Sequence, residues 1–279
     1  MLVFKNIKNL QEHLSSFSAN TTIGFVPTMG ALHQGHLSLI KSASLNNDIV
    51  VISIFVNPTQ FDKPKDLDKY PRTLDADVSL LKLIKCDVVF APTAAEMYAD
   101  KVQSTSFDFD GLEHVMEGEF RTGHFDGVGT IVKKFFEIVN PTNAYFGEKD
   151  FQQLQIIKKM VQKNQLPVKV IGCEIYREDD GLAMSSRNVL LTSEQKKAAP
   201  FIYKTLKGVR QKFETDSIED CVNWVKNEFN NQPLLNLEYF QIADEETLKQ
   251  TQNKNPIKNY RAFIAVFAGK VRLIDNIKL

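Results

Sequence analysis

The sequence lacks any long hydrophobic run. None of its apolar stretches approaches the roughly 20 residues that a membrane helix needs. Residues 1–8 have no continuous apolar core of the kind found in signal peptides. These absences predict a protein with no membrane segment and no secretion signal.

Cysteine is scarce as well, with only Cys86, Cys173 and Cys221 in the chain. Their odd number and wide spacing argue against a disulfide framework or a metal-binding cysteine motif. Cys86 and Cys173 lie beside strand-like runs, so we expect small core residues rather than nucleophiles. This cysteine usage predicts a reducing, cytoplasmic setting.

Neither charge is in excess, since 34 Lys and Arg residues balance 34 Asp and Glu residues. A dedicated nucleic-acid binder usually has a basic excess, so we expect no nucleic-acid partner. What the chain does have is length and apolar content. Its 279 residues, 43% of them hydrophobic, suffice for one large domain or two.

Strand and helix patterns alternate over the first two thirds of the sequence. Short β-branched or aromatic runs, typical of buried strands, occupy residues 22–26, 49–56, 87–90, 144–146 and 168–172. Helical patterns lie between them, and the charged stretch 62–72 is expected to be a loop or a lid. This alternation predicts a doubly wound parallel α/β domain, which we place at residues 1–183.

The pattern changes after that point. Helical periodicity covers residues 192–213 and 217–229, and strand patterns follow at 235–242, 261–267 and 271–274. The short turn at 268–270 predicts that the last two strands pair antiparallel. Residues 184–279 are therefore expected to form a smaller α+β domain.

A turn between the strand at 22–26 and the helix from Leu37 carries the most chemistry. It contains Gly30 and Gly35, which let a ligand approach the backbone, and His33 and His36, which lie three residues apart. A helix start also offers unpaired N–H groups and a partial positive charge. These features suit a polyphosphate, although a glycine-containing loop with two solvated histidines would give the same pattern.

Polar loops also follow two other predicted strands, at residues 57–61 and 147–153. In open parallel sheets, ligands bind beyond the carboxyl ends of the strands. The coincidence of three such loops predicts one shared site.

Five motifs occur in a fixed order: Pro27-Thr28-Met29-Gly30-Ala31-Leu32-His33-Gln34-Gly35-His36, Ser53-Ile54-Phe55-Val56-Asn57-Pro58-Thr59-Gln60-Phe61, Asp68-Lys69-Tyr70-Pro71-Arg72-Thr73, Phe146-Gly147-Glu148-Lys149-Asp150-Phe151-Gln152-Gln153-Leu154 and Met184-Ser185-Ser186-Arg187-Asn188. Together they resemble the pantoate–β-alanine ligase family, whose first motif is a HIGH-type signature. The resemblance implies a Rossmann-like nucleotidyl-transfer domain that binds ATP and pantoate, followed by a small lid domain.

The resemblance also implies a two-step reaction. The pantoate carboxylate attacks the α-phosphate of ATP, which gives pantoyl adenylate and pyrophosphate. The amine of β-alanine then attacks the adenylate, which gives pantothenate and AMP. Mg²⁺ accompanies ATP in this family, and the family's members usually form homodimers through the N-terminal domain.

The family's site residues carry over by motif. The catalytic role falls on His36 and His33, with Lys149 and Arg187. The implied ATP-binding residues are Met29, Gly30, Ala31, Leu32, His33, Gln34, Gly35, His36, Gly147, Glu148, Lys149, Asp150, Tyr176, Met184, Ser185, Ser186 and Arg187. Gln60, Gln153 and Asn57 are expected at pantoate and β-alanine, and Asp77 is the expected carboxylate near the metal.

Some features leave other interpretations open. Asp150 can also act as a helix cap, Ser185 and Ser186 can cap a turn, and His124 can be structural. Three other kinds of protein share parts of the pattern: a nucleotidyltransferase, a small aminoacyl-tRNA synthetase-like enzyme and a nucleotide sensor without turnover. The paired glutamines argue against the first, the zero net charge against the second, and the intact set of cationic and histidine donors against the third.

Overall fold

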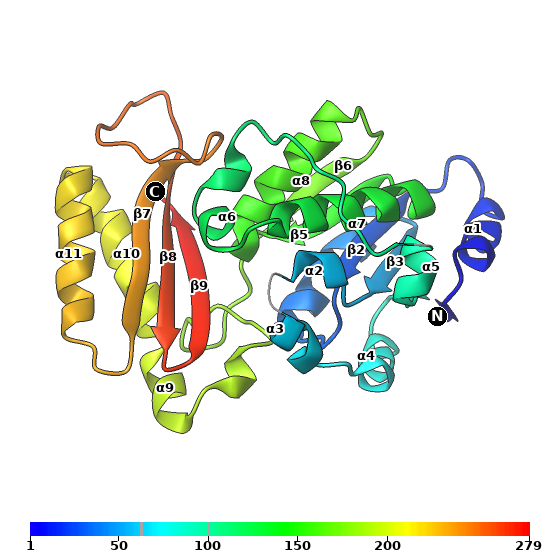
Figure 1. The fold of residues 1–279 in the computed structure, drawn as a ribbon, viewed down its shortest axis with the longest axis horizontal. Coiled ribbons are helices and arrows are strands. Elements are labelled where there is room, and N and C mark those ends of the chain that lie inside the picture. Colours follow the sequence, from blue (N-terminus) through cyan, green and yellow to red (C-terminus); the bar gives the residue numbers. More distant parts are fainter. Residues whose placement is uncertain (62–63, 100) are drawn as a thin grey trace. The chain divides into compact units, whose positions relative to one another are not determined.

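The computed structural model describes residues 1–61, 64–99 and 101–279, and the chain forms two compact units (Figure 1). The N-terminal unit comprises residues 1–148 and 152–174. The C-terminal unit comprises residues 149–151 and 175–279.

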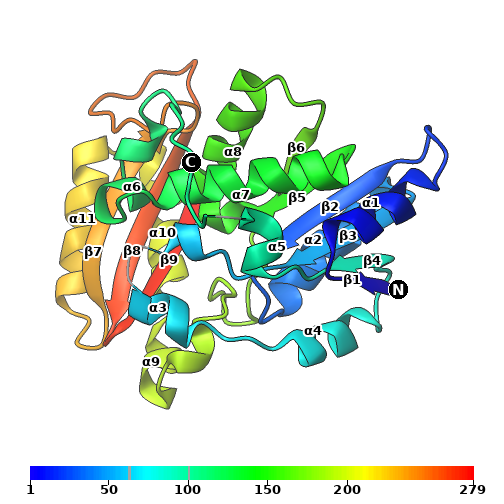
Figure 2. The same cartoon turned by 45° about the vertical axis from the view of Figure 1, so that its right-hand side comes forward.

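The N-terminal unit is built on a six-stranded sheet in the order β1-β4-β3-β2-β5-β6, and every pair of neighbours is parallel. The strands are β1 (Leu2–Phe4), β2 (Ile23–Thr28), β3 (Ile49–Ile54), β4 (Val88–Phe90), β5 (Asn143–Gly147) and β6 (Lys169–Cys173). Four of them, β1 to β4, lie side by side in Figure 2. The predicted parallel α/β domain is confirmed.

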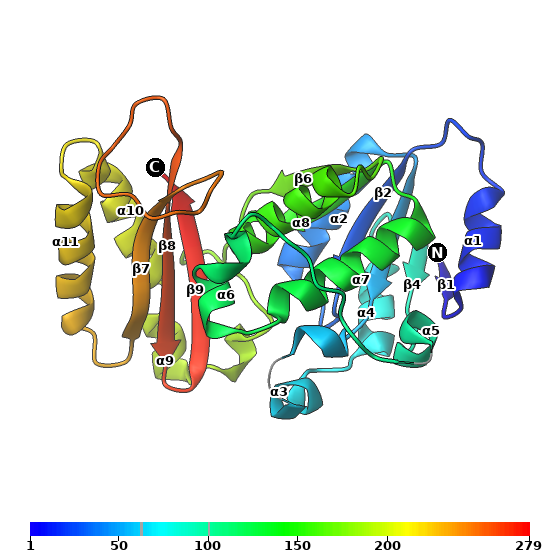
Figure 3. The same cartoon turned by 45° about the horizontal axis from the view of Figure 1, so that its top comes forward.

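Both faces of this sheet are buried, and alternate residues of each strand point to opposite faces. Val26, Val50 and Ile52 join a core cluster with Leu39 and Ile40 of α2 (Gln34–Asn46). The neighbouring positions Phe25 and Phe90 instead contact Phe135 of α7 (His124–Val139). Helices α2 and α7 therefore cover opposite faces, as Figure 3 shows.

The remaining helices that precede β6 are no longer than α2. They are α1 (Ile7–Ser15), α3 (Pro64–Lys69), α4 (Leu74–Leu81), α5 (Ala94–Tyr98), α6 (Glu117–Phe120) and α8 (Phe151–Lys163), with 3-10 turns at Pro58–Gln60, Leu112–His114 and Glu148–Asp150. The expectation of a loop over 62–72 is wrong for α3, where proline at the first helical position suits a helix start. Residues 62 and 63 lie outside the described residues.

The sheet has its topological switch point between β2 and β5, which are neighbours although far apart in sequence. The chain leaves β2 toward β3 on one side, and it leaves β5 toward β6 on the other. The loops after these two strands therefore lead in opposite directions. In doubly wound sheets, ligands bind at such a switch point, beyond the carboxyl ends of the strands.

The C-terminal unit combines a three-stranded antiparallel sheet with two helices on one of its faces (Figure 1). The strands are β7 (Asn236–Asp244), β8 (Tyr260–Ala268) and β9 (Val271–Lys278), and the helices are α10 (Phe201–Phe213) and α11 (Ile218–Asn230). Ala262, Ile264 and Val266 of β8 share one core cluster with Leu206 and Val225 of these helices. The predicted small α+β domain and its antiparallel pairing of the last strands are confirmed.

The helix expected over 192–213 is in fact two helices, α9 (Ser193–Ala198) and α10. Pro200 stands between them, and its missing N–H and rigid ring disfavour a continuous helix. The first helix begins at Thr192, whose side chain accepts a hydrogen bond from the Gln195 N–H.

The compact units also divide earlier than the expected boundary after residue 183. Residues 175–183 belong to the C-terminal unit because Leu182 lies in its core and Arg177 forms an ion pair with Asp275. Residues 149–151 belong to it as well. Within the described ranges, no helix is long and apolar enough to cross a bilayer.

Gly127 lets α7 approach the turn after β3. A Cβ at this position would lie 2.3 Å from the Thr59 carbonyl oxygen and 2.7 Å from the Gln60 nitrogen. Within a helix, alanine is more stabilising than glycine by about 1 kcal/mol. Here the added methyl group would clash with backbone atoms, and overpacking typically destabilises a protein by about 1–3 kcal/mol. We expect Gly127→Ala to lower the melting temperature.

The matched control is Gly147→Ala, since no atom lies within 4 Å of a Cβ added there. Both variants are compared by thermal unfolding followed by circular dichroism. Equal melting temperatures for the two variants would contradict the close approach at Gly127.

Candidate active site

Two histidines cap the N-terminus of α2 at the end of the loop that follows β2. His33 is the N-cap residue, and its Nδ1 accepts a hydrogen bond from the Gly35 N–H at 3.1 Å. The Nδ1 of His36 accepts from the His33 N–H at 3.2 Å. A neutral imidazole that accepts through Nδ1 carries its hydrogen on Nε2. The local backbone therefore selects the tautomer in which each ring donates from Nε2.

Asp77 fixes the loop between β2 and α2. This residue of α4 is only 3% exposed, and its Oδ1 accepts from the Leu32 N–H at 2.8 Å while its Oδ2 accepts from the Ala31 N–H at 3.1 Å. Oδ2 also accepts from the Thr73 hydroxyl. The carboxylate thus holds two successive backbone amides just before the histidine pair, where Ala31 has a φ of 50°.

The same contacts bear on whether Asp77 could bind magnesium. Both oxygens of Asp77 face hydrogen-bond donors, which favours a positioning role for this residue over the metal-proximal role that the resemblance implies. Among the described residues, no group of three or more His, Cys, Asp or Glu side chains could hold a metal ion.

Gln60 lies in the turn after β3, and Asn57 orients its carboxamide. Asn57 is 1% exposed, and its Nδ2 donates to Gln60 Oε1 and to the Gly127 carbonyl, both at 3.1 Å. The Asn57 Oδ1 accepts from the hydroxyls of Tyr98 and Thr59. These four bonds use the whole hydrogen-bonding capacity of the Asn57 side chain, which favours an orienting role over direct substrate contact.

The orientation of Gln60 follows from that contact. Because its Oε1 accepts from Asn57, its Nε2 donates, and here it meets the Met29 sulfur at 2.9 Å. The loops after β2 and β3 are thereby joined. From α7, His124 Nδ1 lies 2.8 Å from the Gln60 carbonyl oxygen, so Nδ1 is the donor, and Arg121 lies beside its Nε2 at 3.3 Å.

The two adjacent glutamines at the start of α8 differ in environment. Gln152 is buried, donates to the carbonyls of Leu112 and Val115, and accepts from the Glu117 N–H. Gln153 is half-buried, and its carboxamide makes no hydrogen bond within the described part of the chain. Gln152 is therefore structural, and Gln153 is the side chain able to bind a ligand.

The other expected residues belong to the C-terminal unit. Lys149 is half-buried and lies 3.7 Å from the Asp150 carboxylate. Tyr176 and Met184 are joined by a backbone hydrogen bond of 3.0 Å, and the Ser185 hydroxyl accepts from the N–H of the exposed Arg187. By contrast, Gly147, the last residue of β5, and Glu148, the first residue of the next 3-10 turn, belong to the N-terminal unit.

The structure brings the loops after β2 and β3, with Asp77, into one network of contacts in the N-terminal unit. Sequence reasoning missed the contacts that Thr59 and Tyr98 make with Asn57, and Tyr98 lies in none of the five motifs. It gave Asp77 and Asn57 direct ligand roles. Cys86 is a core residue as expected, and burial raises the pKa of its thiol to about 12. A thiol with that pKa stays protonated at neutral pH, so Cys86 is not a nucleophile.

If Asp77 holds the loop, its removal should expose to exchange the two backbone amides that donate hydrogen bonds to it. We expect Asp77→Ala to accelerate hydrogen exchange at Ala31 and Leu32, because each amide loses its carboxylate acceptor. Asp75→Ala is the matched control, since Asp75 lies exposed on the same helix. Mass spectrometry of peptides covering 29–36 measures the effect, and equal exchange in the two variants would exclude this role.

Comparison with known proteins identifies the family of this chain. The family model for pantoate-beta-alanine ligase matches residues 2–278. A pantothenate synthetase from Flavobacterium psychrophilum is 56% identical over the full length of both chains, and one from Bacteroides fragilis is 48% identical over all of this chain and 99% of its own.

Solved structures give the same result. The pantothenate synthetase of Thermus thermophilus is similar with a TM-score of 0.92 and 37% identity, covering 100% of this chain and 99% of its own. The pantoate-beta-alanine ligase of Francisella tularensis, solved in complex with beta-gamma ATP and beta-alanine, has a TM-score of 0.82 and 38% identity, covering 100% and 97%. With a family model matching nearly every residue and relatives aligned end to end, this chain belongs to the pantoate–β-alanine ligase family.

Proposed function

We propose that this protein condenses pantoate with β-alanine at the expense of ATP, by way of pantoyl adenylate, and releases AMP and pyrophosphate. The observation that carries the proposal is the reciprocal cap of His33 and His36 at the switch point of the sheet. Two Nε2 donors and a helix N-terminus suit nucleotide phosphates, which in doubly wound folds bind beyond the carboxyl ends of the strands.

The first step needs stabilisation of growing negative charge. When a pantoate carboxylate oxygen attacks the α-phosphorus, the bond to the bridging oxygen breaks and pyrophosphate leaves. Donors that are already fixed toward this charge lower the barrier without reorganising. The α2 backbone fixes both histidines, and Asp77 fixes the loop in front of them.

Pantoate carries a carboxylate and hydroxyl groups, and a carboxamide can both donate to and accept from such a ligand. Gln60 offers an amide whose orientation Asn57 determines, and Gln153 offers a carboxamide without a protein partner among the described residues. We assign pantoate to these two glutamines. Asn57 then contributes to pantoate binding by orienting the Gln60 carboxamide.

Lys149 and Arg187 are proposed to bind the ATP phosphates. Their cations complement the charge that develops on pyrophosphate. In the second step, the β-alanine amine attacks the acyl carbon, the bond to the AMP oxygen breaks, and the ammonium proton is lost as the amide forms. Mg²⁺, bound through the phosphates, would neutralise part of their charge when it is present.

The oligomeric state and the cellular location of the enzyme stay predictions. A homodimer that forms through the N-terminal unit is our expectation for its assembly. The three cysteines are all unpaired thiols in the structure, which is compatible with a reducing, cytoplasmic location.

Replacing His36 tests the phosphate site. We expect His36→Ala to lower the rate of adenylate formation by roughly 10²–10³-fold, because one fixed donor to the transition state is lost. His36→Asn should lose a similar amount of activity while its Oδ1 replaces the Nδ1 of the cap. The measurement is single-turnover formation of pyrophosphate, with circular dichroism to confirm folding.

The control is His114→Ala, since His114 is an exposed histidine far along the chain, with a side chain 79% exposed. Near-normal turnover in folded His36→Asn would remove His36 from the reaction. Product analysis separates the reaction classes, because a ligase releases both AMP and pyrophosphate whereas a nucleotidyltransferase releases pyrophosphate without AMP.

Gln153 is tested by the first half-reaction alone. With pantoate present and β-alanine absent, the wild type should exchange labelled pyrophosphate into ATP, and Gln153→Ala should exchange far less. A site built around such a carboxamide loses about 1–3 kcal/mol when one partner is left unpaired, which corresponds to roughly 5- to 150-fold. Gln162→Ala, an exposed position on the same helix, is the matched control.

Exchange that depends on β-alanine would exclude a free-standing adenylate step. Unimpaired exchange in Gln153→Ala would instead remove this glutamine from the pantoate site.

A further inference from the structure

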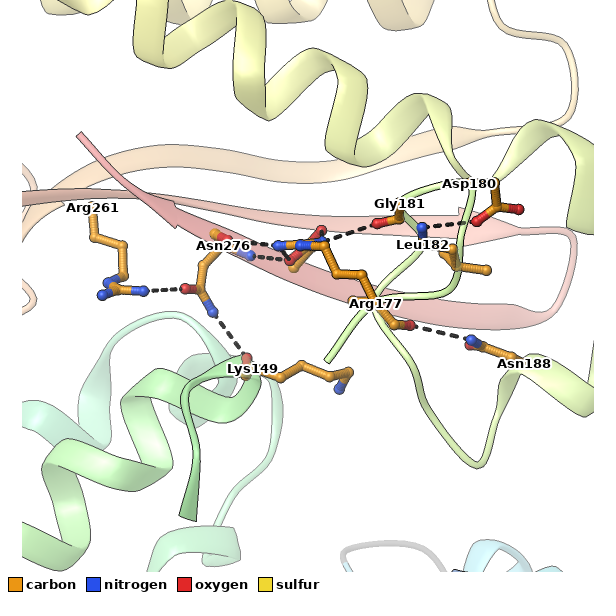
Figure 4. A network of polar contacts seen from close by, with 10 residues as sticks. Lys149, Arg177, Asp180, Gly181, Leu182, Asn188, Arg261 and Asn276 are labelled. Atoms are coloured by element: carbon orange, nitrogen blue, oxygen red, sulfur yellow. Dashed lines mark hydrogen bonds and ion pairs between the residues drawn. The ribbon is translucent and has the colours of Figure 1, made fainter. Parts of the chain in front are cut away.

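Two neighbouring residues of β9, Asp275 and Asn276, hold different segments of the C-terminal unit. Figure 4 shows Asn276 between Arg261 and Lys149. Both are almost fully buried, at 5% and 2% exposure. Successive residues of a strand point to opposite faces of the sheet. We call this pair the β9 anchor.

Asn276 holds the short segment Lys149–Phe151 on one face. Its Nδ2 donates to the Lys149 carbonyl oxygen at 3.0 Å, and its Oδ1 accepts from Arg261 Nη1 at 2.6 Å. The Arg261 guanidinium in turn lies 3.9 Å from the centre of the Phe151 ring, and Phe263 also contacts that ring. The main chain at Lys149 is thus fixed from a residue more than a hundred positions away.

Asp275 holds the turn after residue 176 on the helix-covered face, the side of Leu273 and Ile277. Arg177 donates to both of its oxygens, at 2.7 and 2.9 Å, and also donates to the Gly181 carbonyl at 3.1 Å. Burial raises the pKa of the Asp275 carboxyl, and the Arg177 guanidinium opposes that rise. The Tyr203 ring lies 3.5 Å from the guanidinium and completes its burial.

The same turn leads into the segment that carries Arg187. Arg177 and Ala183 form an antiparallel bridge, and the buried Asn188 donates to the Ala183 carbonyl and to Glu178. The anchor therefore connects the backbone at Lys149 to the base of the segment 184–188 through a continuous series of hydrogen bonds.

We infer that Asn276 is a positioning residue for the reaction: it places the Lys149 ammonium by holding the Lys149 carbonyl, and Asp275 with Arg177 holds the Arg187 segment at the same strand. This inference rests on the proposed function, in which both cations bind the ATP phosphates. Asn276 itself acts through the main chain of Lys149.

Asn276→Asp is a near-isosteric test. The substitution keeps an oxygen for Arg261 but replaces the Nδ2 donor with an acceptor, which leaves the Lys149 carbonyl facing an oxygen. We expect kcat/KM for ATP in pyrophosphate exchange to fall roughly tenfold or more, since the part-buried Lys149 carbonyl loses its side-chain donor and its segment shifts. The KM for pantoate should stay unchanged, because the glutamines that bind it lie in the N-terminal unit.

Two further variants separate positioning from charge and from general stability. Asn276→Ser removes the same donor without adding a negative charge near Lys149, and it should lose activity in the same direction. Glu238→Gln disrupts the ion pair with Arg272 on the same sheet, and it should exchange pyrophosphate like the wild type. All three are compared at a temperature at which circular dichroism shows each to be folded.

A double mutant decides how Asn276 acts. If it works through Lys149, Asn276→Asp should add little to the defect of Lys149→Ala, because coupled residues are not additive. Fully additive losses, an equal rise in the pantoate KM, or wild-type exchange in Asn276→Ser would overturn the inference. Full activity in Lys149→Ala would instead overturn the phosphate role of Lys149 in the proposed function.

Discussion

Pairing of β2 with β5 is the constraint on which the candidate site depends. These two parallel strands are neighbours, yet the chain continues from them toward opposite edges of the sheet. The loops after them therefore lead toward opposite edges of the sheet, which is the topology at whose carboxyl end doubly wound folds bind ligands. A parallel sheet buried on both faces offers few other places where polar groups can reach a ligand.

After β2 and β3, the histidine pair and Gln60, which have proposed substrate contacts, are held by residues that have none. Asp77 holds the loop of the histidine pair, Asn57 sets the amide of Gln60, and His124 holds its carbonyl. Such supporting contacts fix side chains before a ligand arrives, and fixed donors are more effective in catalysis than mobile ones. Because these polar side chains are hydrogen-bonded, they can be buried in a core that is otherwise apolar.

Much of this could be predicted from the sequence, for a physical reason. Strand and helix periodicity is a local property, and the glycine and histidine spacing after 22–26 describes a single turn, so both are visible in one window of sequence. The roles of Asp77 and Asn57 were not visible in this way. Their bonding partners lie at Ala31, Leu32 and Tyr98, and nothing local shows that those partners use up their hydrogen-bonding capacity. The unit boundary failed for the same reason, since the pair of Arg177 and Asp275 joins residues 98 positions apart.

The three residues 149–151 have a consequence for how this architecture can be divided. The chain passes from one compact unit to the other at 148, returns at 151 and leaves again at 174. The C-terminal unit is therefore not one continuous segment at the end of the chain, and cleavage at a single position cannot separate the two units. A fragment ending at residue 174 would strip Phe151, now 6% exposed, of Arg261 and Phe263, and would leave the Lys149 carbonyl without Asn276. Exchange of this unit between relatives has to carry the three-residue segment along with residues 175–279, so the unit is not a contiguous module for recombination.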